Sequence, residues 1–237
     1  MVEVTTFCTG CRACEKICPK HCISMKPDSE GFLYAEIDQS LCVDCGACRK
    51  TCPQNLKVVN DSPLKIYALR SNDDKLLKKS ASGGVFAVAA MFVIQNGGVV
   101  FGAAYDKNMC VKHIKVDCET DLWKLQNSKY VQSDTGDTYV EVKQLLENGI
   151  TVLYSGTPCQ IAGLKRFLKR DYDNLFSMDI VCHGVPSPKI FAKYIEWQSK
   201  RLGESVVYCN FRDKAGGWGQ SLVLVTSPKG RRLSIMG

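Results

Sequence analysis

Two stretches of twelve residues share one cysteine pattern, Cys-x2-Cys-x2-Cys-x3-Cys-Pro: CTGCRACEKICP at residues 8–19 and CVDCGACRKTCP at residues 42–53. This spacing is typical of proteins that hold two 4Fe-4S clusters, in which the fourth cysteine of each run binds the cluster of the other run. The pattern therefore predicts two clusters with crossed ligation. The first would be held by Cys8, Cys11, Cys14 and Cys52, and the second by Cys42, Cys45, Cys48 and Cys18.

The proline after the fourth cysteine of each run supports this interpretation. Proline has no N–H and favours an extended residue before it, so the chain leaves each cysteine loop in a fixed direction. Zinc is the alternative, because it also binds Cys-x2-Cys pairs, but zinc takes four ligands, usually as two separated pairs. Each run here has three cysteines at two-residue spacing and a fourth before proline, and the pattern occurs twice. We therefore expect iron–sulfur clusters and one-electron transfer.

Length and cysteine content limit the class of protein further. The chain has 237 residues and 14 cysteines, more than the eight that the clusters need. The length suits one small domain and one ordinary domain with its own core. The sequence does not begin with a basic and then apolar signal segment, and oxygen-sensitive clusters with reduced thiols fit a reducing compartment. We expect a cytoplasmic protein of an anaerobe, with no membrane span, since the longest apolar run, 85–94, is too short.

The net charge of +7 is spread over several short basic pairs. No basic stripe with interleaved aromatic residues is present, so we expect no nucleic-acid partner. A mildly basic surface suits an acidic partner such as a small ferredoxin, or an enzyme subunit. A solvated surface without a partner is an equally open interpretation.

The order of expected elements predicts an α+β protein. Residues 1–60 would form a ferredoxin-type domain with two clusters, in which short strands at 22–25 and 34–37 flank a turn at 27–31. Residues 61–237 alternate helices and strands, which predicts an α/β domain with a mixed sheet. The expected strands are 65–70, 99–105, 111–116, 150–154, 175–181, 206–211, 221–226 and 231–235. The expected helices are 72–79, 85–95, 137–147, 157–169 and 187–203. Because the sequence ends inside an expected strand, we expect the natural protein to continue.

Three junctions in the second domain carry unusual residues. The loop 80–84, Ser-Ala-Ser-Gly-Gly, opens a helix, where free N–H groups favour phosphate; it is also a common kind of tight helix entry. After the strand 150–154, Thr157, Pro158 and Gln160 form a capping box. This places Cys159 in the first helical turn, where the helix dipole stabilises a thiolate. Cys159 could face a flavin, bind a further cluster, act as a redox thiol or simply be buried.

The third junction, 179–188, again leads from a strand into a helix. Ligands bind at the carboxyl ends of strands in open α/β sheets. We therefore expect Cys182 to lie close to Cys159, and His183 to donate to a flavin carbonyl or relay a proton, or else to be a structural or exposed loop histidine. Lys129 and Arg212 could hold phosphate, and Trp218 in a glycine-rich loop could cover a ring. Cys110, Cys118 and Cys209 are interpreted as packing residues or free thiols.

These segments resemble the coenzyme F420 hydrogenase/dehydrogenase beta-subunit family. The resemblance is carried by SASGG at 80–84, SKYVQS at 128–133, GTPCQ at 156–160, DIVCHGVPSP at 179–188 and FRDK at 211–214. It implies an iron–sulfur oxidoreductase containing FAD, with the flavin held near these loops. The implied cofactor-binding residues are Ser82, Gly83, Gly84, Lys129, Tyr130, Thr157, Gln160 and Arg212. The candidate catalytic residues are Cys159, Cys182 and His183. The family's C-terminal part is expected to be missing.

The expected function is electron exchange between FAD and two 4Fe-4S clusters, coupled to a ferredoxin-like partner, a reduced (deaza)flavin or a partner enzyme subunit. A first alternative is a non-enzymatic electron-transfer subunit in which the second domain only docks. A second alternative is a regulatory or scaffold protein of a glycan-modification system that uses its clusters as a redox sensor.

Overall fold

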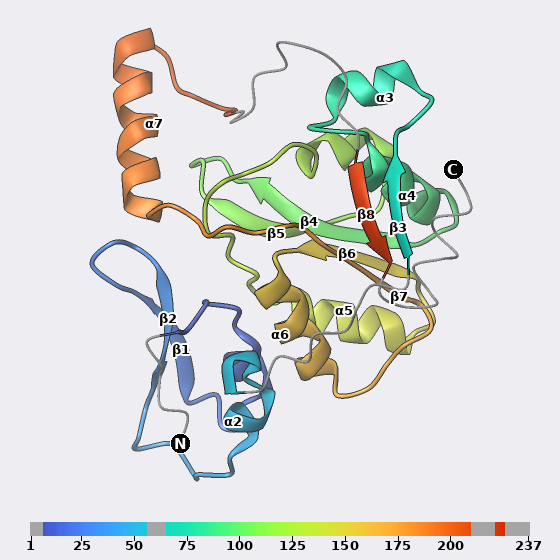
Figure 1. Cartoon of the computed structure of the whole chain (residues 1–237). Helices are drawn as coiled ribbons and strands as arrows, with labels where there is room; N and C mark the ends of the chain where they lie inside the picture. The colour runs from blue at the N-terminus through green and yellow to red at the C-terminus, as the bar shows by residue number, and fades with distance from the viewer. Residues whose placement is uncertain (1–6, 56–64, 210–220, 226–237) are drawn as a thin grey trace.

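The computed structural model describes residues 7–55, 65–209 and 221–225, the last of these by backbone alone. Figure 1 shows two parts: a small cysteine-rich module near the N-terminus, and a larger part built around a sheet. Among the described residues, no helix is both long and apolar enough to cross a membrane.

The cysteine-rich module consists of two similar units. It contains α1 (Ala13–Ile17), β1 (Ile23–Pro27), β2 (Leu33–Ile37), α2 (Ala47–Thr51) and the 3-10 turn η1 (Pro53–Asn55). Each short helix begins after a residue in the left-handed region, Arg12 at φ 63° and Gly46 at φ 69°, which hold equivalent places in the two runs. Each helix ends at an extended cysteine before proline, as the sequence predicts. The strands β1 and β2 pair antiparallel, with Ile23 opposite Ile37.

The larger part is an α/β unit with a mixed sheet, as expected. It contains α3 (Asp74–Lys79), α4 (Val85–Gln95), β4 (Val99–Tyr105), β5 (Val111–Val116), η2 (Glu119–Lys124), α5 (Thr138–Glu147), β6 (Val152–Gly156), α6 (Pro158–Leu168), β7 (Leu175–Asp179) and α7 (Pro188–Leu202). The sheet order is β5-β4-β6-β7. The strands β4, β6 and β7 are parallel, and β5 is antiparallel to β4. A separate antiparallel pair joins β3 (Lys65–Leu69) to β8 (Ser221–Val225).

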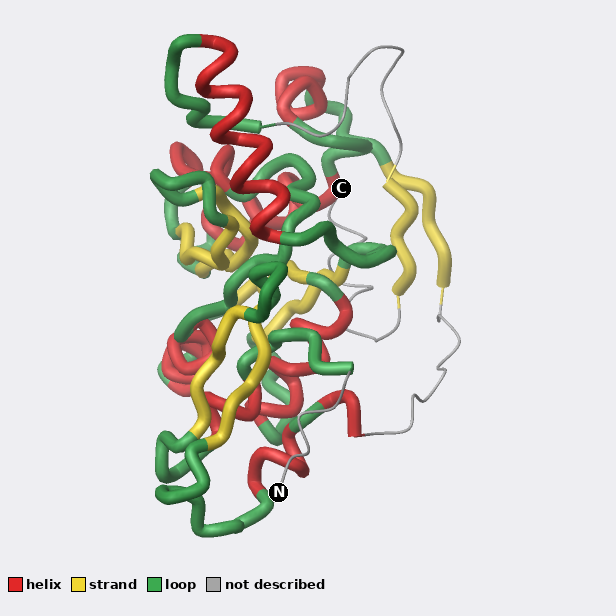
Figure 2. Tube along the Cα trace, turned by 90° about the vertical axis from the view of Figure 1, so that its left-hand side faces the viewer, coloured by secondary structure: helices red, strands yellow, loops and turns green. Residues whose placement is uncertain are grey.

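Helices cover both faces of the sheet, because its strands are apolar on both sides. On one face, Val100 and Leu153 pack with Ala90 and Val93 of α4. On the other face, Phe101 and Tyr154 belong to a core shared with α5 and α6. The module lies on the side of α5 and α6, as the two perpendicular views show (Figures 1 and 2).

The structure corrects a few expected elements. Residues 206–209 of the strand expected at 206–211 are not in a strand, and Tyr208 instead accepts a hydrogen bond of 2.7 Å from Asn127. The strand β7 ends at Asp179 rather than 181, because the chain then turns away after Ile180 donates to the Gly156 carbonyl. The 3-10 turn η2 was not predicted. The expected strand 231–235 and the linker near residue 60 lie outside the described residues.

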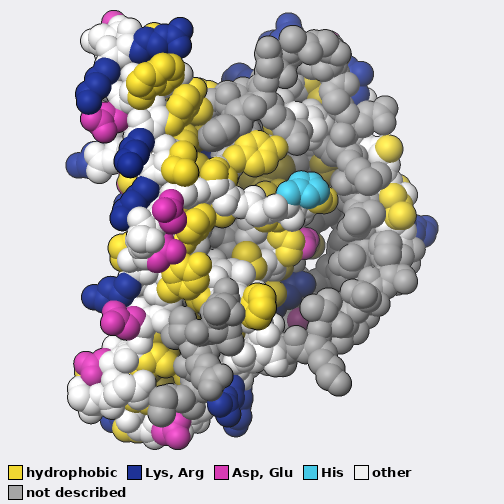
Figure 3. All heavy atoms as spheres, turned by 60° about the vertical axis from the view of Figure 1, so that its left-hand side comes forward, with side chains coloured by type: hydrophobic (Ala, Val, Ile, Leu, Met, Phe, Trp, Pro, Cys, Tyr) yellow, Lys and Arg dark blue, Asp and Glu magenta, His cyan; other side chains and the backbone are white. Residues whose placement is uncertain are grey.

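Charge on the surface is mixed. On the side shown as a space-filling view, lysine and arginine side chains lie beside acidic and hydrophobic ones (Figure 3). On α7, exposed apolar side chains include Ile190, Tyr194 and Trp197, and Arg201 lies over the Trp197 ring.

Candidate functional site

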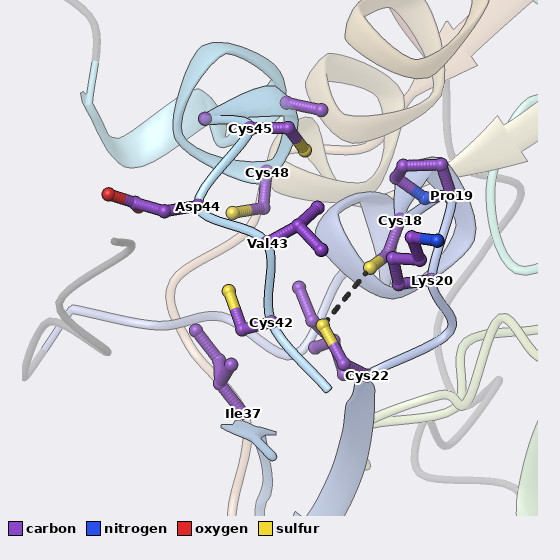
Figure 4. Close-up of a pocket in the computed structure, with 13 residues that line it drawn as sticks. Cys18, Pro19, Lys20, Cys22, Ile37, Cys42, Val43, Asp44, Cys45 and Cys48 are labelled. Carbon is purple, nitrogen blue, oxygen red and sulfur yellow. Dashed lines mark hydrogen bonds between the residues drawn. The ribbon is translucent and has the colours of Figure 1, made fainter. Parts of the chain in front are cut away.

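The cysteines of the module line two cavities. The outer site, as we call the cavity around the second run, encloses about 380 Å³ with its mouth. It is lined by the four cysteines predicted for the second cluster and by one more: Cys18, Cys22, Cys42, Cys45 and Cys48. Figure 4 shows these side chains arranged around the space between the loop after α1 and the loop before α2.

The inner site, around the first run, is similar in size at about 310 Å³. Its cysteines are those predicted for the first cluster: Cys8, Cys11, Cys14 and Cys52. The last cysteine of each run thus lines the cavity of the other run, which is the crossed arrangement that the spacing predicts. The cysteines are brought together as expected, and ligation itself stays a prediction.

The donor set of each cavity fits a cluster rather than one ion. Among the described residues, no group of three or more His, Cys, Asp or Glu side chains could hold a single metal ion. Four thiols around an open space are what a 4Fe-4S cluster requires, since each thiolate binds a different iron. Among the described residues that line the two cavities, the exposed Asp44 at the outer site is the only carboxylate.

Burial changes the acidity of the inner thiols. Removal from water raises the pKa of Cys11 to about 11 and that of Cys14 to about 12, and the neighbouring thiols add to the effect at Cys14. Because metal ligands must be deprotonated, iron has to displace these protons when a cluster is assembled. At the outer site burial also opposes ionisation of Cys18, but hydrogen bonds from the amides and the thiol of the following turn outweigh it and lower its pKa.

The inner site is built into the α/β part. Cys11 is buried and belongs to the same core as Phe101, Tyr139 and Tyr154. Gly163 of α6 allows this approach, because a Cβ there would lie 3.0 Å from the Cys11 Sγ and 3.1 Å from the Tyr139 Oη. A larger residue at this position would push on Cys11, a predicted cluster ligand.

Ion pairs fasten the module beside this contact. Arg12 forms a two-pronged pair with Asp134 and also donates to Glu15 at 2.7 and 2.9 Å. Burial opposes ionisation of Asp134, but the hydrogen bonds from Arg12 and the Gly136 amide outweigh it and hold the pKa of this carboxyl below its usual range. Lys16 adds a 2.6 Å pair to Asp137 at the start of α5. The first cysteine run therefore supplies both predicted cluster ligands and the contacts to the second domain.

The loops predicted to hold a flavin leave the sheet at one edge. β4, β6 and β7 are parallel, so their carboxyl ends, at Tyr105, Gly156 and Asp179, lie side by side. The helix α4 returns from this edge to the start of β4, which places the loop 80–84 there too. Because ligands bind at the carboxyl ends of strands in open α/β sheets, these loops together are the candidate ligand site.

The predicted capping box is present at the start of α6. The Gln160 Oε1 accepts from the Thr157 N–H at 3.0 Å, and its Nε2 donates to the Ser133 carbonyl at 3.0 Å. Both ends of this side chain are therefore used to hold the loop, which favours a positioning role for Gln160. The half-buried Cys159 Sγ lies 3.0 Å from the Thr157 Oγ1.

The other predicted residues are spread along this edge. The Lys129 ammonium donates to the Gln126 carbonyl at 2.8 Å and lies over the Tyr105 ring, and burial lowers its pKa to about 8. It is thus held by the protein itself. Cys182 and His183 are exposed after β7, and no hydrogen bond between described side chains joins Cys182 to Cys159. Gly84 adopts φ 82° at the start of α4, Ser82 is half-buried and Tyr130 is exposed. Arg212 and Trp218 lie outside the described residues.

Sequence reasoning missed a buried histidine below this edge. His113 of β5 stacks on Tyr154 at 5.3 Å, with hydrogen bonds of 2.8 Å to the Ser133 Oγ and 3.0 Å to the Ser155 carbonyl. Burial lowers its pKa to about 4, so the ring is neutral and its Nε2–H donates to the carbonyl. The available signal was the period of two along 111–116, which puts His113 on the same face as the buried Val111.

Comparison with known families agrees with both parts of the chain. Residues 7–56 match the 4Fe-4S dicluster domain, and residues 149–235 match the C terminus of the coenzyme F420 hydrogenase/dehydrogenase beta subunit. The family resemblance is thereby confirmed. The beta-subunit match includes the loops at 156–160 and 179–188, and it extends through Arg212. Together the two matches support an iron–sulfur protein with a role in electron transfer.

Solved structures show the same fold at greater distance. One chain of the F420-reducing [NiFe] hydrogenase complex from Methanosarcina barkeri is similar with a TM-score of 0.56 and 16% sequence identity, over 76% of this chain and 81% of that chain. At this identity the likeness shows the fold alone. A comparison with curated protein sequences found no match.

Proposed function

We propose that the chain is an FAD-containing iron–sulfur oxidoreductase subunit, in which the inner site faces the flavin domain and the outer site faces a redox partner. The observation that carries this proposal is the unequal placement of the two cavities. The inner site shares a core with the α/β part, whereas the outer site has its own small core of Cys18, Cys22, Ile23 and Ala35.

The helix α6 connects the candidate flavin loop to the inner site. Cys159 stands in its first turn, and Gly163, four residues later, touches Cys11. Residues four apart lie on one face of a helix, about 6 Å from each other. The face of α6 that receives the inner site therefore also carries Cys159, which makes this thiol the strongest of the candidate catalytic residues.

The outer site is open to a partner. Cys45 is exposed, and two apolar side chains beside it, Leu41 and Val43, are 54% and 57% exposed. Exposed apolar residues around a redox centre favour close approach of another protein. We infer a ferredoxin-like protein or an enzyme subunit as the partner, in keeping with the net charge of +7 and an acidic binding surface on the other side.

The loops at the carboxyl edge of the sheet carry chemical groups that suit the phosphate and the ring of FAD. The helix α4 begins at Gly84 without a side-chain cap, so its N-terminal end can receive a phosphate. Ser82, Gly83 and Gly84 would hold that phosphate, with Arg212, while Tyr130, Thr157 and Cys159 would line the ring. When bound, FAD supplies exchange of electron pairs with a small substrate and of single electrons with a cluster. The chain's own residues orient the ring and exclude water.

Direct analysis of the purified protein tests this proposal. Protein purified without oxygen should contain about eight irons, matching sulfide and about one FAD per chain. Ser82→Glu puts a negative charge where the phosphate would lie, and should release flavin while iron stays. Gln144→Glu, an exposed position on α5, makes the same change in charge away from the edge and should keep both.

Eight irons without flavin would overturn the flavin assignment. The chain would then be an electron-transfer subunit that passes electrons to or from a partner enzyme and binds no substrate itself. One observation favours this second candidate: the Lys129 ammonium, predicted to hold phosphate, is already bound to two backbone carbonyls. Retention of flavin in both variants would instead place the flavin elsewhere in the protein.

A further inference from the structure

The outer site contains a cysteine that the cluster count does not use. Cys22 follows Cys18 by four residues, outside the Cys-x2-Cys-x2-Cys-x3-Cys pattern. A turn brings it back: the His21 N–H donates to the Cys18 carbonyl at 3.2 Å, and His21 adopts φ 49°. A left-handed conformation is uncommon for a residue other than glycine, so this turn is a specific feature of the loop.

The turn directs the Cys22 thiol at a predicted cluster ligand. The Cys22 Sγ lies 3.4 Å from the Cys18 Sγ, and both line the outer site (Figure 4). The side chain is 6% exposed, and its backbone carbonyl accepts from the Asp38 N–H at 2.8 Å. Both the backbone and the side chain of Cys22 are therefore held in place. The sulfurs are too far apart for a disulfide, whose bond is about 2.05 Å.

Within the described part of the chain, the inner site has no such thiol. The cysteines among its lining residues are the four predicted ligands alone. In the repeated sequence, the position equivalent to Cys22 is occupied by Leu56, four residues after Cys52. The two runs therefore differ by one cysteine at an equivalent position of the sequence.

We propose that Cys22 is a positioning residue of the outer cluster, which donates an S–H···S hydrogen bond to the Cys18 thiolate. Once Cys18 binds iron, its sulfur has no proton, so only Cys22 can donate. A hydrogen bond to a ligand sulfur stabilises the more negative, reduced cluster and raises its reduction potential. The outer site thereby gains a potential-raising contact that has no counterpart among the described residues of the inner site.

The proposal rests on the proposed function, which assigns a cluster to the outer site. The experiment tests the cluster assignment and the role of Cys22 separately. Potentials of both clusters are measured by EPR-monitored redox titration of the full chain, with iron content measured on the same samples. Cys22→Ala removes the donor, and Cys22→Ser keeps an O–H donor. Cys110→Ala removes an exposed thiol at the β4–β5 turn and serves as the control.

We expect Cys22→Ala to shift the outer potential to a more negative value and leave the inner potential unchanged. Cys22→Ser should shift it less, and Cys110→Ala not at all. An unchanged outer potential in Cys22→Ala, or equal shifts in the Ala and Ser variants, would refute the hydrogen bond. Loss of about four irons in both Cys22 variants would instead make Cys22 a ligand. A wild-type protein with one EPR signal would remove the cluster assignment itself.

Discussion

The inner and outer sites come from one repeated sequence but occupy different surroundings. Both have the four thiols predicted to bind a cluster, a left-handed residue before a short helix, and an extended cysteine before proline. The inner site is packed against α6 through Cys11 and Gly163, whereas the outer site exposes Cys45. The pattern of cysteines sets what each site can hold. The residues between and after the cysteines set what each site faces.

The largest difference between the two sites should appear when Cys52 or Cys18, the predicted ligand that each site receives from the other run, is replaced. Cys52→Ser should damage the inner cluster, and Cys18→Ser the outer one, although each lies in the other run. Because the Cys22 Sγ is only 3.4 Å from Cys18, the variant Cys18→Ser/Cys22→Ser makes the clean test at the outer site. We expect loss of about four of eight irons and of one EPR signal in each case.

If Cys52→Ser removed the signal of the Cys42–Cys48 loop instead, the crossed assignment would be wrong. The single variants Cys18→Ser and Cys52→Ser serve as controls for each other, since each alters one cysteine before a proline.

The contact at Gly163 should matter to the inner site alone. Gly163→Val places a branched side chain against the Cys11 Sγ, where even a Cβ has only 3.0 Å. Overpacking of this kind costs about 1–3 kcal/mol, and the ligand loop is the part that can move. We expect loss or distortion of the inner EPR signal with the outer signal intact. Ala162→Val makes a β-branched change at the preceding residue of α6 as a control, and equal damage by both would show that the helix, not the contact, is affected.

The ion pair between Arg12 and Asp134 should stabilise docking of the module. Arg12→Ala leaves Asp134 half-buried without its main partner, at a cost of about 2 kcal/mol for a charged hydrogen-bonded pair. Hydrogen exchange of residues 8–17 should then become faster. Lys200→Ala breaks an exposed pair on α7, worth about 0.5 kcal/mol or less, and should leave this exchange unchanged. Unaltered exchange in Arg12→Ala would mean that the shared core alone holds the module.

The smallest expected effect is a loss of folding stability at low pH, caused by His113. With its pKa lowered to about 4 by burial, His113 is neutral in the folded protein, while the unfolded chain binds a proton near pH 6.5. Its contribution to stability is therefore complete above about pH 6.5 and is lost as the pH falls towards 4, by about 1 kcal/mol at pH 6. NMR should show a ring resonance that does not titrate between pH 8 and 5 and is missing in His113→Gln. A midpoint near 6.5 would contradict the buried, neutral ring.

Much of the fold was predictable because its signals are local. The helix 85–95 and the strands 99–105 and 111–116 have the predicted bounds. The first two are continuous, mainly apolar runs that follow a glycine, whereas 111–116 mixes β-branched residues with lysine and histidine. The strand expected at 206–211 failed at 206–209, where Tyr208 has a side-chain partner distant in sequence. The pairing of β3 with β8 outside the main sheet likewise depends on residues far apart in the chain.

The candidate site divides in the same way. Grouping of the eight cysteines follows from spacing, which is fixed by the geometry of a cluster. The contacts of Gly163 with Cys11 and of Arg12 with Asp134 join residues more than 100 positions apart, and no spacing rule relates them. Cys22 could have been noticed as a fifth cysteine near the first run, but its orientation depends on the turn at His21.

Arg12 occupies a left-handed position that glycine fills in the other run, at a backbone cost of about 1–2 kcal/mol. This choice breaks the two-fold pseudosymmetry of the module. Turned by half a revolution, the module would present Gly46 to Asp134, and that half-buried carboxylate would lose its main partner. Docking of the module in the reversed orientation is therefore disfavoured. Of its two equivalent halves, only the one that contains the first cysteine run can pack against the α/β part with this ion pair formed.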